Sequence, residues 1–240
     1  MVKKIITLTA IMIFGMISLA VADTTFVDLN NWTQEGIPAN GNWTVAPDGS
    51  YVTQSINGDP TYFVSDTNYI NTEFKGTLEV QTTADDDFIG FVFGYNGSND
   101  YLLLDWKQGT QSWNGGYAYE GFTLSRITDT DTTTDFWDHT GTGIEVLDTN
   151  YGDEKGWLNN TEHEFTLTYS LNRILIDIDG ATIFNVAGAF DDGKFGFYNY
   201  SQANVKYEGL TGSPVPIPPT LLLLGSGFIG LIGMYRRKKV

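Results

Sequence analysis

The chain has 240 residues, a formal net charge of −16 at pH 7 and no cysteine. The lack of cysteine excludes disulfide bracing and thiolate zinc sites. The acidic balance disfavours binding to nucleic acid and to anionic membranes, which carry charge of the same sign.

The N-terminal residues 1–22 have the pattern of a secretory signal peptide. Lys3 and Lys4 precede an apolar stretch, and Ala20-Val21-Ala22 offers a small-x-small cleavage site. We therefore expect export and cleavage after Ala22. The alternative at this end is an uncleaved N-terminal anchor.

The middle of the chain, residues 23–211, predicts a single all-β domain. About 190 residues are enough for one full hydrophobic core. Short apolar or alternating runs recur between clusters of Gly, Asn, Asp and Thr, which favours an antiparallel two-sheet jelly-roll sandwich. Asp179-Gly180 and Asn96-Gly97 predict hairpin turns. The predicted strands are Gly76–Gln81, Phe88–Phe93, Tyr101–Trp106, Phe122–Ile127, Phe165–Tyr169, Ile174–Ile178, Ala181–Val186, Lys194–Tyr200 and Ala203–Tyr207.

Three consecutive carboxylates, Asp85, Asp86 and Asp87, stand directly before an aromatic and β-branched run. Three adjacent carboxylates at the start of a buried strand repel one another, so we expect a counter-ion near them. Calcium takes 6–8 oxygen ligands in irregular geometry, so the triplet is a candidate calcium site. Asp191 and Asp192 are candidates for further ligands. The plainer interpretation is an exposed acidic loop that ends a strand.

The negative charge of the exported part of the chain favours the binding of cations. All 29 acidic residues but only seven of the 13 basic ones lie between the two ends, and 7 − 29 gives −22. A bound cation would relieve this self-repulsion.

The region around the triplet resembles a thrombospondin C-terminal domain. The resemblance rests on Asp85–Asp87, Gly90–Tyr95, Trp106–Gln108, Thr110, Gln111 and Trp113, and it extends collinearly over residues 58–209. It implies a lectin-like jelly roll with extracellular placement, calcium binding and a role in adhesion. The chain lacks the Asp-rich calcium repeats that precede this domain in animal members.

Catalytic signatures are weak. Asp177 and Asp179 alternate on one strand face, as the carboxylate pair of a retaining glycosidase does, but Asp179 fits better as the first residue of a turn. His139 beside Asp138 is interpreted as a loop-packing residue. His163, between two glutamates, is interpreted as solvated. These observations favour a non-enzymatic protein.

Aromatic residues suggest a second kind of binding. Exposed rings can stack on sugars, and the loop-associated candidates are Trp32, Trp43, Trp113, Tyr117 and Tyr119. Packing within the sandwich is the usual role of such rings. The alternative function is therefore a carbohydrate-binding module.

The C-terminal residues 212–240 resemble a PEP-CTERM sorting tail of Gram-negative bacteria. Val215-Pro216-Ile217-Pro218 leads into an apolar segment at about 217–235, followed by Arg236 to Lys239. The acidic residue usual in the motif is Ile217 here. The resemblance implies a membrane helix that a sorting protease (an exosortase) removes. The protein is then displayed or released at the surface; otherwise it stays as a single-pass anchor facing the periplasm.

The sequence thus predicts an exported, calcium-binding, lectin-like domain that acts in adhesion or in an exopolysaccharide matrix. A carbohydrate-binding module is the alternative, and a jelly-roll glycosidase is a more distant one.

Overall fold

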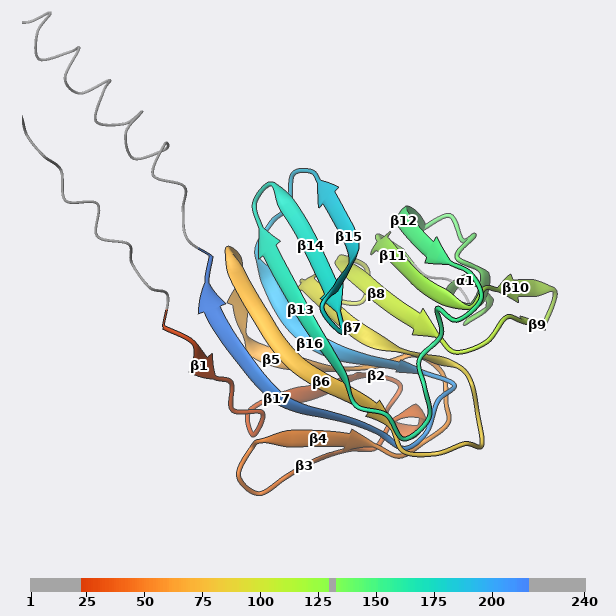
Figure 1. The fold of residues 1–240 in the computed structure, drawn as a ribbon, viewed down its shortest axis with the longest axis horizontal. Coiled ribbons are helices and arrows are strands. Elements are labelled where there is room, and N and C mark those ends of the chain that lie inside the picture. The colour runs from red at the N-terminus through yellow and green to blue at the C-terminus, as the bar shows by residue number, and fades with distance from the viewer. Residues whose placement is uncertain (1–22, 130–132, 216–240) are drawn as a thin grey trace, which may run out of the picture.

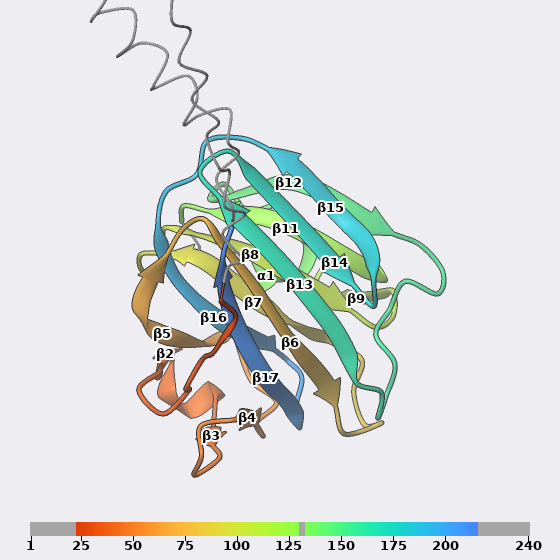
Figure 2. The ribbon, with the colours of Figure 1, turned by 60° about the vertical axis from the view of Figure 1, so that its left-hand side comes forward.

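The computed structural model describes residues 23–129 and 133–215. Two antiparallel sheets face each other, as the views in Figures 1 and 2 show, and this confirms the predicted all-β sandwich. Strands that are distant in sequence alternate within each sheet, which is the sign of jelly-roll connections.

The first sheet has eight strands. Its order is β15 (Ala181–Ala187), β14 (Arg173–Ile178), β13 (His163–Ser170), β6 (Thr72–Val80), β17 (Val205–Pro214), β4 (Tyr51–Gln54) and β3 (Trp43–Val45), and β1 (Thr25–Phe26) also pairs with β17. Strand β17 runs to Pro214, three residues past the expected domain end at 211.

The second sheet has seven strands and carries the acidic triplet at one end. Its order is β12 (Ile144–Tyr151), β11 (Gly121–Ile127), β8 (Tyr101–Lys107), β7 (Phe88–Tyr95), β16 (Gly193–Tyr200), β5 (Thr61–Tyr69) and β2 (Thr33–Gly36). The hairpin of β9 (Gln111–Trp113) and β10 (Gly116–Ala118) projects from the body (Figure 1), and η1 (Pro38–Asn40) and α1 (Thr133–Asp138) are short helices.

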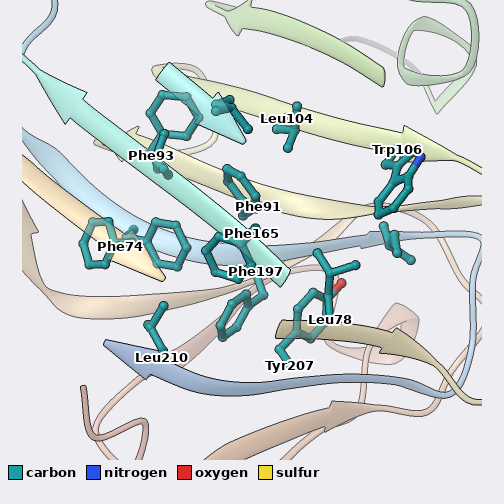
Figure 3. Close-up of a cluster of buried hydrophobic side chains, with 14 of the residues drawn as sticks. Phe74, Leu78, Phe91, Phe93, Leu104, Trp106, Phe165, Phe197, Tyr207 and Leu210 are labelled. Carbon is teal, nitrogen blue, oxygen red and sulfur yellow. The ribbon is translucent and has the colours of Figure 1, made fainter. Parts of the chain in front are cut away.

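The main core lies between the two sheets, where alternate residues of the strands meet (Figure 3). Phe91 of β7 packs on Phe165 of β13 with ring centroids 4.9 Å apart, and Phe197 of β16 stacks on Tyr207 of β17 at 4.4 Å. Burying one large aromatic side chain contributes roughly 1.5–3 kcal/mol. With no disulfide in the chain, this packing holds the sheets together.

A second cluster covers the outer face of the second sheet. Phe88, Val92 and Leu103 point to this side, and Trp137 of α1 packs on Phe88 at 5.4 Å. Both faces of β7 and β8 are therefore buried. This explains why these strands read as continuous apolar runs and not as a strict alternation.

Two predicted turns are confirmed. Asp179 and Gly180 both have positive φ, +50° and +76°, as a type I′ hairpin turn requires, and they join β14 to β15. Asn96-Gly97 lies in the connection between β7 and β8. Strands β5 and β12 were not predicted, because polar residues interrupt the former and the latter is largely exposed.

Candidate metal and ligand site

The acidic triplet lies where the chain enters β7, beside the end of β8. Antiparallel pairing sets Phe88 opposite Lys107, so the carboxylates meet the end of the neighbouring strand. Asp85, Asp86 and Asp87 each have a carboxylate oxygen within 4.8 Å of the others. The structure therefore brings together the three residues in which the sequence predicted a cation site.

Lys107 supplies an internal counter-ion to this group. Its side chain is fully buried, and Nζ lies 2.8 Å from Oδ1 of Asp87 and 3.1 Å from Oδ1 of Asp86. The same nitrogen donates to the carbonyl of Asp86 at 2.8 Å and to Oε1 of Gln111 at 3.1 Å. The rings of Phe88 and Trp137 lie 5.5 and 5.1 Å from it. Buried ammonium groups need this kind of full pairing.

The ion pair leaves the triplet with unbalanced negative charge. Three carboxylates and one ammonium give −3 + 1 = −2 at this point of the surface. Partial burial raises the pKa of the Asp85 carboxyl, and the negative charges of Asp87 and Asp86 raise it further. Asn57 donates to Asp85 from a neighbouring loop. The donor set consists of oxygens, which suits a hard divalent cation.

A cavity of about 270 Å³ opens beside the triplet and shares Asp87 with it. Asn57 and Asp59 line it with polar groups, and Trp113 and Trp137 line it with rings. Trp113 is 44% exposed and lies 5.4 Å from Trp137, ring to ring. This triplet cavity therefore combines carboxylates, an amide and an accessible indole, a mixture that is typical of small-ligand sites.

The other two aromatic candidates form a separate surface. Tyr117 and Tyr119 are exposed, and their rings meet at 4.8 Å, while Tyr119 stacks on Tyr151 at 5.1 Å. Neither tyrosine lines the triplet cavity. Trp32 is buried, and Trp43 stacks on Phe63 at 5.6 Å, so these two indoles serve the core.

Asp191 and Asp192 do not join the triplet. They precede Gly193, where β16 begins, whereas the triplet lies beside Tyr200, where β16 ends, and Asp87 N donates to Gln202. An eight-residue strand spans roughly 24 Å, so the expected convergence is wrong. Antiparallel pairing of β16 with β7 places the two acidic groups at opposite ends.

Both histidines are paired with carboxylates. His139 Nε2 lies 2.7 Å from Oδ2 of the buried Asp105, in agreement with a packing role. His163 was expected to be solvated, which is wrong: it is buried, and its Nδ1 lies 2.7 Å from Oδ2 of Asp179. Neighbouring residues on a strand point to opposite faces, so the flanking glutamates do not indicate whether the His163 side chain is buried.

A comparison with protein-family models matches residues 38–213 to the thrombospondin C-terminal region. The chain belongs to this family. The thrombospondin-2 proteins of chicken and human are each 30% identical to it, over 191 and 190 residues, which is 70% of this chain. The chain spans only 16% of the length of these relatives.

Solved structures similar to this thrombospondin C-terminal domain are lectin-like sandwiches. The carbohydrate-binding module CBM66 from Bacillus subtilis has a TM-score of 0.53 at 11% identity, over 76% of this chain and 95% of that one. The exoplasmic domain of VIP36 in its Ca²⁺/Man3GlcNAc-bound form has a TM-score of 0.51 at 12% identity, over 81% and 89%. At these identities the likeness shows the shared fold.

The expected signal peptide at residues 1–22 and most of the expected sorting tail lie outside the described residues. Of the motif Val215 to Pro218, only Val215 is described, and its N–H donates to Asn71 O at 2.8 Å. Within residues 23–129 and 133–215, no helix is long and apolar enough to cross a membrane.

Proposed function

We propose that this protein is an exported, non-enzymatic, calcium-binding lectin-like domain that holds a ligand in the triplet cavity. Its role is adhesion or association with an extracellular matrix such as exopolysaccharide. The observation that carries the proposal is that Asp87 belongs both to the acidic triplet and to the wall of a cavity containing an exposed tryptophan.

Calcium fits the triplet on charge and donor type. The residual charge of −2 equals the charge that a calcium ion neutralises, and carboxylate oxygens are its preferred ligands. Asp85 and Asp86 are partly exposed and can reach an ion on the solvent side while Lys107 holds the inner side. Such an ion would fix the loop that forms one edge of the cavity.

A specific observation also supports the alternative of a carbohydrate-binding module. The Trp113 ring is accessible at the cavity, and Asn57 and Asp59 provide the hydrogen-bonding groups that sugar hydroxyls need. The two functions differ in their dependence on calcium, because aromatic stacking does not require the ion. A ligand class shared by both is an uncharged or cationic saccharide, since the surface is strongly acidic.

The glycosidase alternative has little support at the carboxylates proposed for it. Asp179 is committed to the hairpin turn, where it binds His163 and accepts from the N–H of Glu164 at 2.9 Å. Asp177 accepts from the hydroxyl of Thr182. Neither residue lines the triplet cavity.

Export and sorting complete the proposal. The signal sequence places the domain outside the cytoplasm, and an exosortase-type protease acts on the tail at Val215 to Pro218. Until that cleavage, the apolar segment at about 217–235 anchors the protein in the membrane. Mass spectrometry of the cell-surface form tests this step, because the tail is either present or missing.

The experiment that tests the binding function is a pull-down with purified exopolysaccharide in calcium and in excess chelator. Retention only with calcium supports the calcium-dependent function. Equal retention in both supports the aromatic carbohydrate module, and no retention in either contradicts both. A Trp113→Ala variant should lose retention in either case.

A further inference from the structure

A second hollow, of about 580 Å³, opens between the edges of the two sheets. Trp106 and Phe122 of the second sheet form one wall, and Ile178 and Ile183 of the first sheet form the other. Trp106 lies at one end of the main core in Figure 3, so this inter-sheet cleft leads directly into the core. Its volume falls within the range of small-molecule sites, roughly 300–1,000 Å³.

Hydrogen bonds hold the loop over this cleft in place. Trp106 Nε1 donates to Lys155 O at 2.7 Å, and Oε1 of Glu120 accepts from the N–H groups of Lys155 and Gly156 at 3.1 and 3.2 Å. Gly156 lies so close to Gln108 that a Cβ there would sit 1.9 Å from its carbonyl oxygen. The loop is therefore fixed, and the cleft is formed before any ligand arrives.

The polar groups on the walls are already bonded to the protein. His163 uses both ring nitrogens, one with Asp179 Oδ2 at 2.7 Å and the other accepting from Leu158 N at 3.1 Å. Gln108 Nε2 donates to Trp157 O at 3.0 Å. A sugar would find these groups occupied and would leave its hydroxyls without partners, at a cost of about 1–3 kcal/mol for each buried group. The walls therefore favour an apolar body.

The rim of the cleft is acidic. Glu120, Glu154 and Asp179 carry three negative charges against the single positive charge of Lys155, which leaves −3 + 1 = −2. Leu158, 59% exposed, extends the apolar surface to the mouth. An acidic rim around an apolar interior selects a positively charged head and repels an anionic one.

We propose that the inter-sheet cleft binds a small organic cation, with its apolar body between Trp106, Phe122 and Ile183 and its positive group at Glu154 and Asp179. This site is distinct from the triplet cavity and needs no calcium. Trp157 touches both regions, since it lines the cleft and its Nε1 donates to Asp87 O at 3.0 Å.

The test uses two probes of equal length and opposite charge, hexyltrimethylammonium and hexyl sulfate, with excess chelator. Two-dimensional NMR of the purified protein follows the indole N–H signals. We expect saturable shifts of Trp106 and Trp157 with the cation, at least tenfold weaker binding of the sulfate, and little change at Trp113. Equal binding of both probes, or no saturable shift with the cation, would overturn the proposal.

Variants place the site. Ile183→Trp fills the cleft and should weaken binding of the cation at least tenfold, while the matched Ile183→Val leaves it open and should bind within about twofold. Glu154 is exposed, so Glu154→Gln should not disturb the fold. This variant should weaken binding of the cation two- to fivefold and should not weaken binding of the sulfate. Unchanged affinity in both Glu154→Gln and Ile183→Trp would contradict the assignment.

Discussion

The ammonium nitrogen of Lys107 lies 2.8 Å from Oδ1 of Asp87, and both side chains are buried. Lys107 also binds two acceptors from Asp86 and the amide oxygen of Gln111. From the sequence, the acidic triplet was expected to need an external counter-ion. In the structure, Lys107 supplies a counter-ion from within the chain. Calcium, in our proposal, neutralises the charge that Lys107 leaves over.

Replacing Lys107 should be severely destabilising. Lys107→Met leaves Asp87 buried without a partner, and removal of one member of a buried pair costs about 3–5 kcal/mol. Urea unfolding measures the change. The matched control is Lys75→Met, which removes an exposed pair with Glu73 and should cost at most about 1 kcal/mol. A loss for Lys107→Met no larger than the control would show that the buried pair contributes little.

Asp85→Asn should separate metal binding from folding. Asp85 carries part of the unbalanced charge of the triplet, and it does not contact Lys107 in the ion pairs described. We therefore expect the variant without calcium to be at least as stable as the parent, and to show no rise in Tm when calcium is added. Asp192→Asn, at the other end of β16, is the control and should keep the full rise. Differential scanning calorimetry reports both values.

The calcium effect should depend on pH. Because the pKa of Asp85 is raised above its usual value of 3.8, the contribution of this carboxyl to stability is complete below pH 3.8 and is lost as the pH rises through the raised pKa. Calcium relieves the repulsion only when the carboxylates are ionised. The rise in Tm on adding calcium should therefore be larger at pH 7 than at pH 4. A rise that is equal at both pH values would point to a site without Asp85.

Trp113 should contribute to ligand binding and not to calcium binding. Trp113→Ala removes the exposed ring at the triplet cavity, and loss of one stacking ring in a ligand site typically weakens binding tenfold or more. Its Tm rise with calcium should stay within about 1 °C of the parent value. Tyr117→Ala, on the other surface of the same hairpin, is the matched control for polysaccharide retention. Equal loss of polysaccharide retention in both variants would indicate that the ligand binds to the whole hairpin and not to the triplet cavity.

Much of this fold follows from local sequence patterns. Phe88–Phe93 and Tyr101–Trp106 were predicted as strands because they are apolar runs of six residues between turn signals. This length is typical of a buried strand and is short for a helix. The hairpin at Asp179-Gly180 follows from the ability of Asp and Gly to adopt positive φ. Among the strands that the sequence did not predict, β5 mixes polar residues with its apolar ones, and β12 is largely exposed.

The site could be predicted only in part. Asp85 to Asp87 are adjacent in sequence, so their proximity needs no knowledge of topology. The role of Lys107 depends on the register between β7 and β8, and the distance to Asp191 and Asp192 depends on the direction of β16. The position of Trp137 against Lys107 depends on how α1 covers the second sheet. A lysine at the end of a buried strand, twenty residues after an acidic triplet, was the available clue.

Isothermal titration calorimetry of metal-free protein with calcium shows whether the acidic triplet binds the ion. We expect saturable calcium binding in the parent and in Asp192→Asn, and loss of that binding in Asp85→Asn. Absence of calcium binding in the parent, or binding that survives in Asp85→Asn with unchanged affinity, would contradict a calcium site at the triplet.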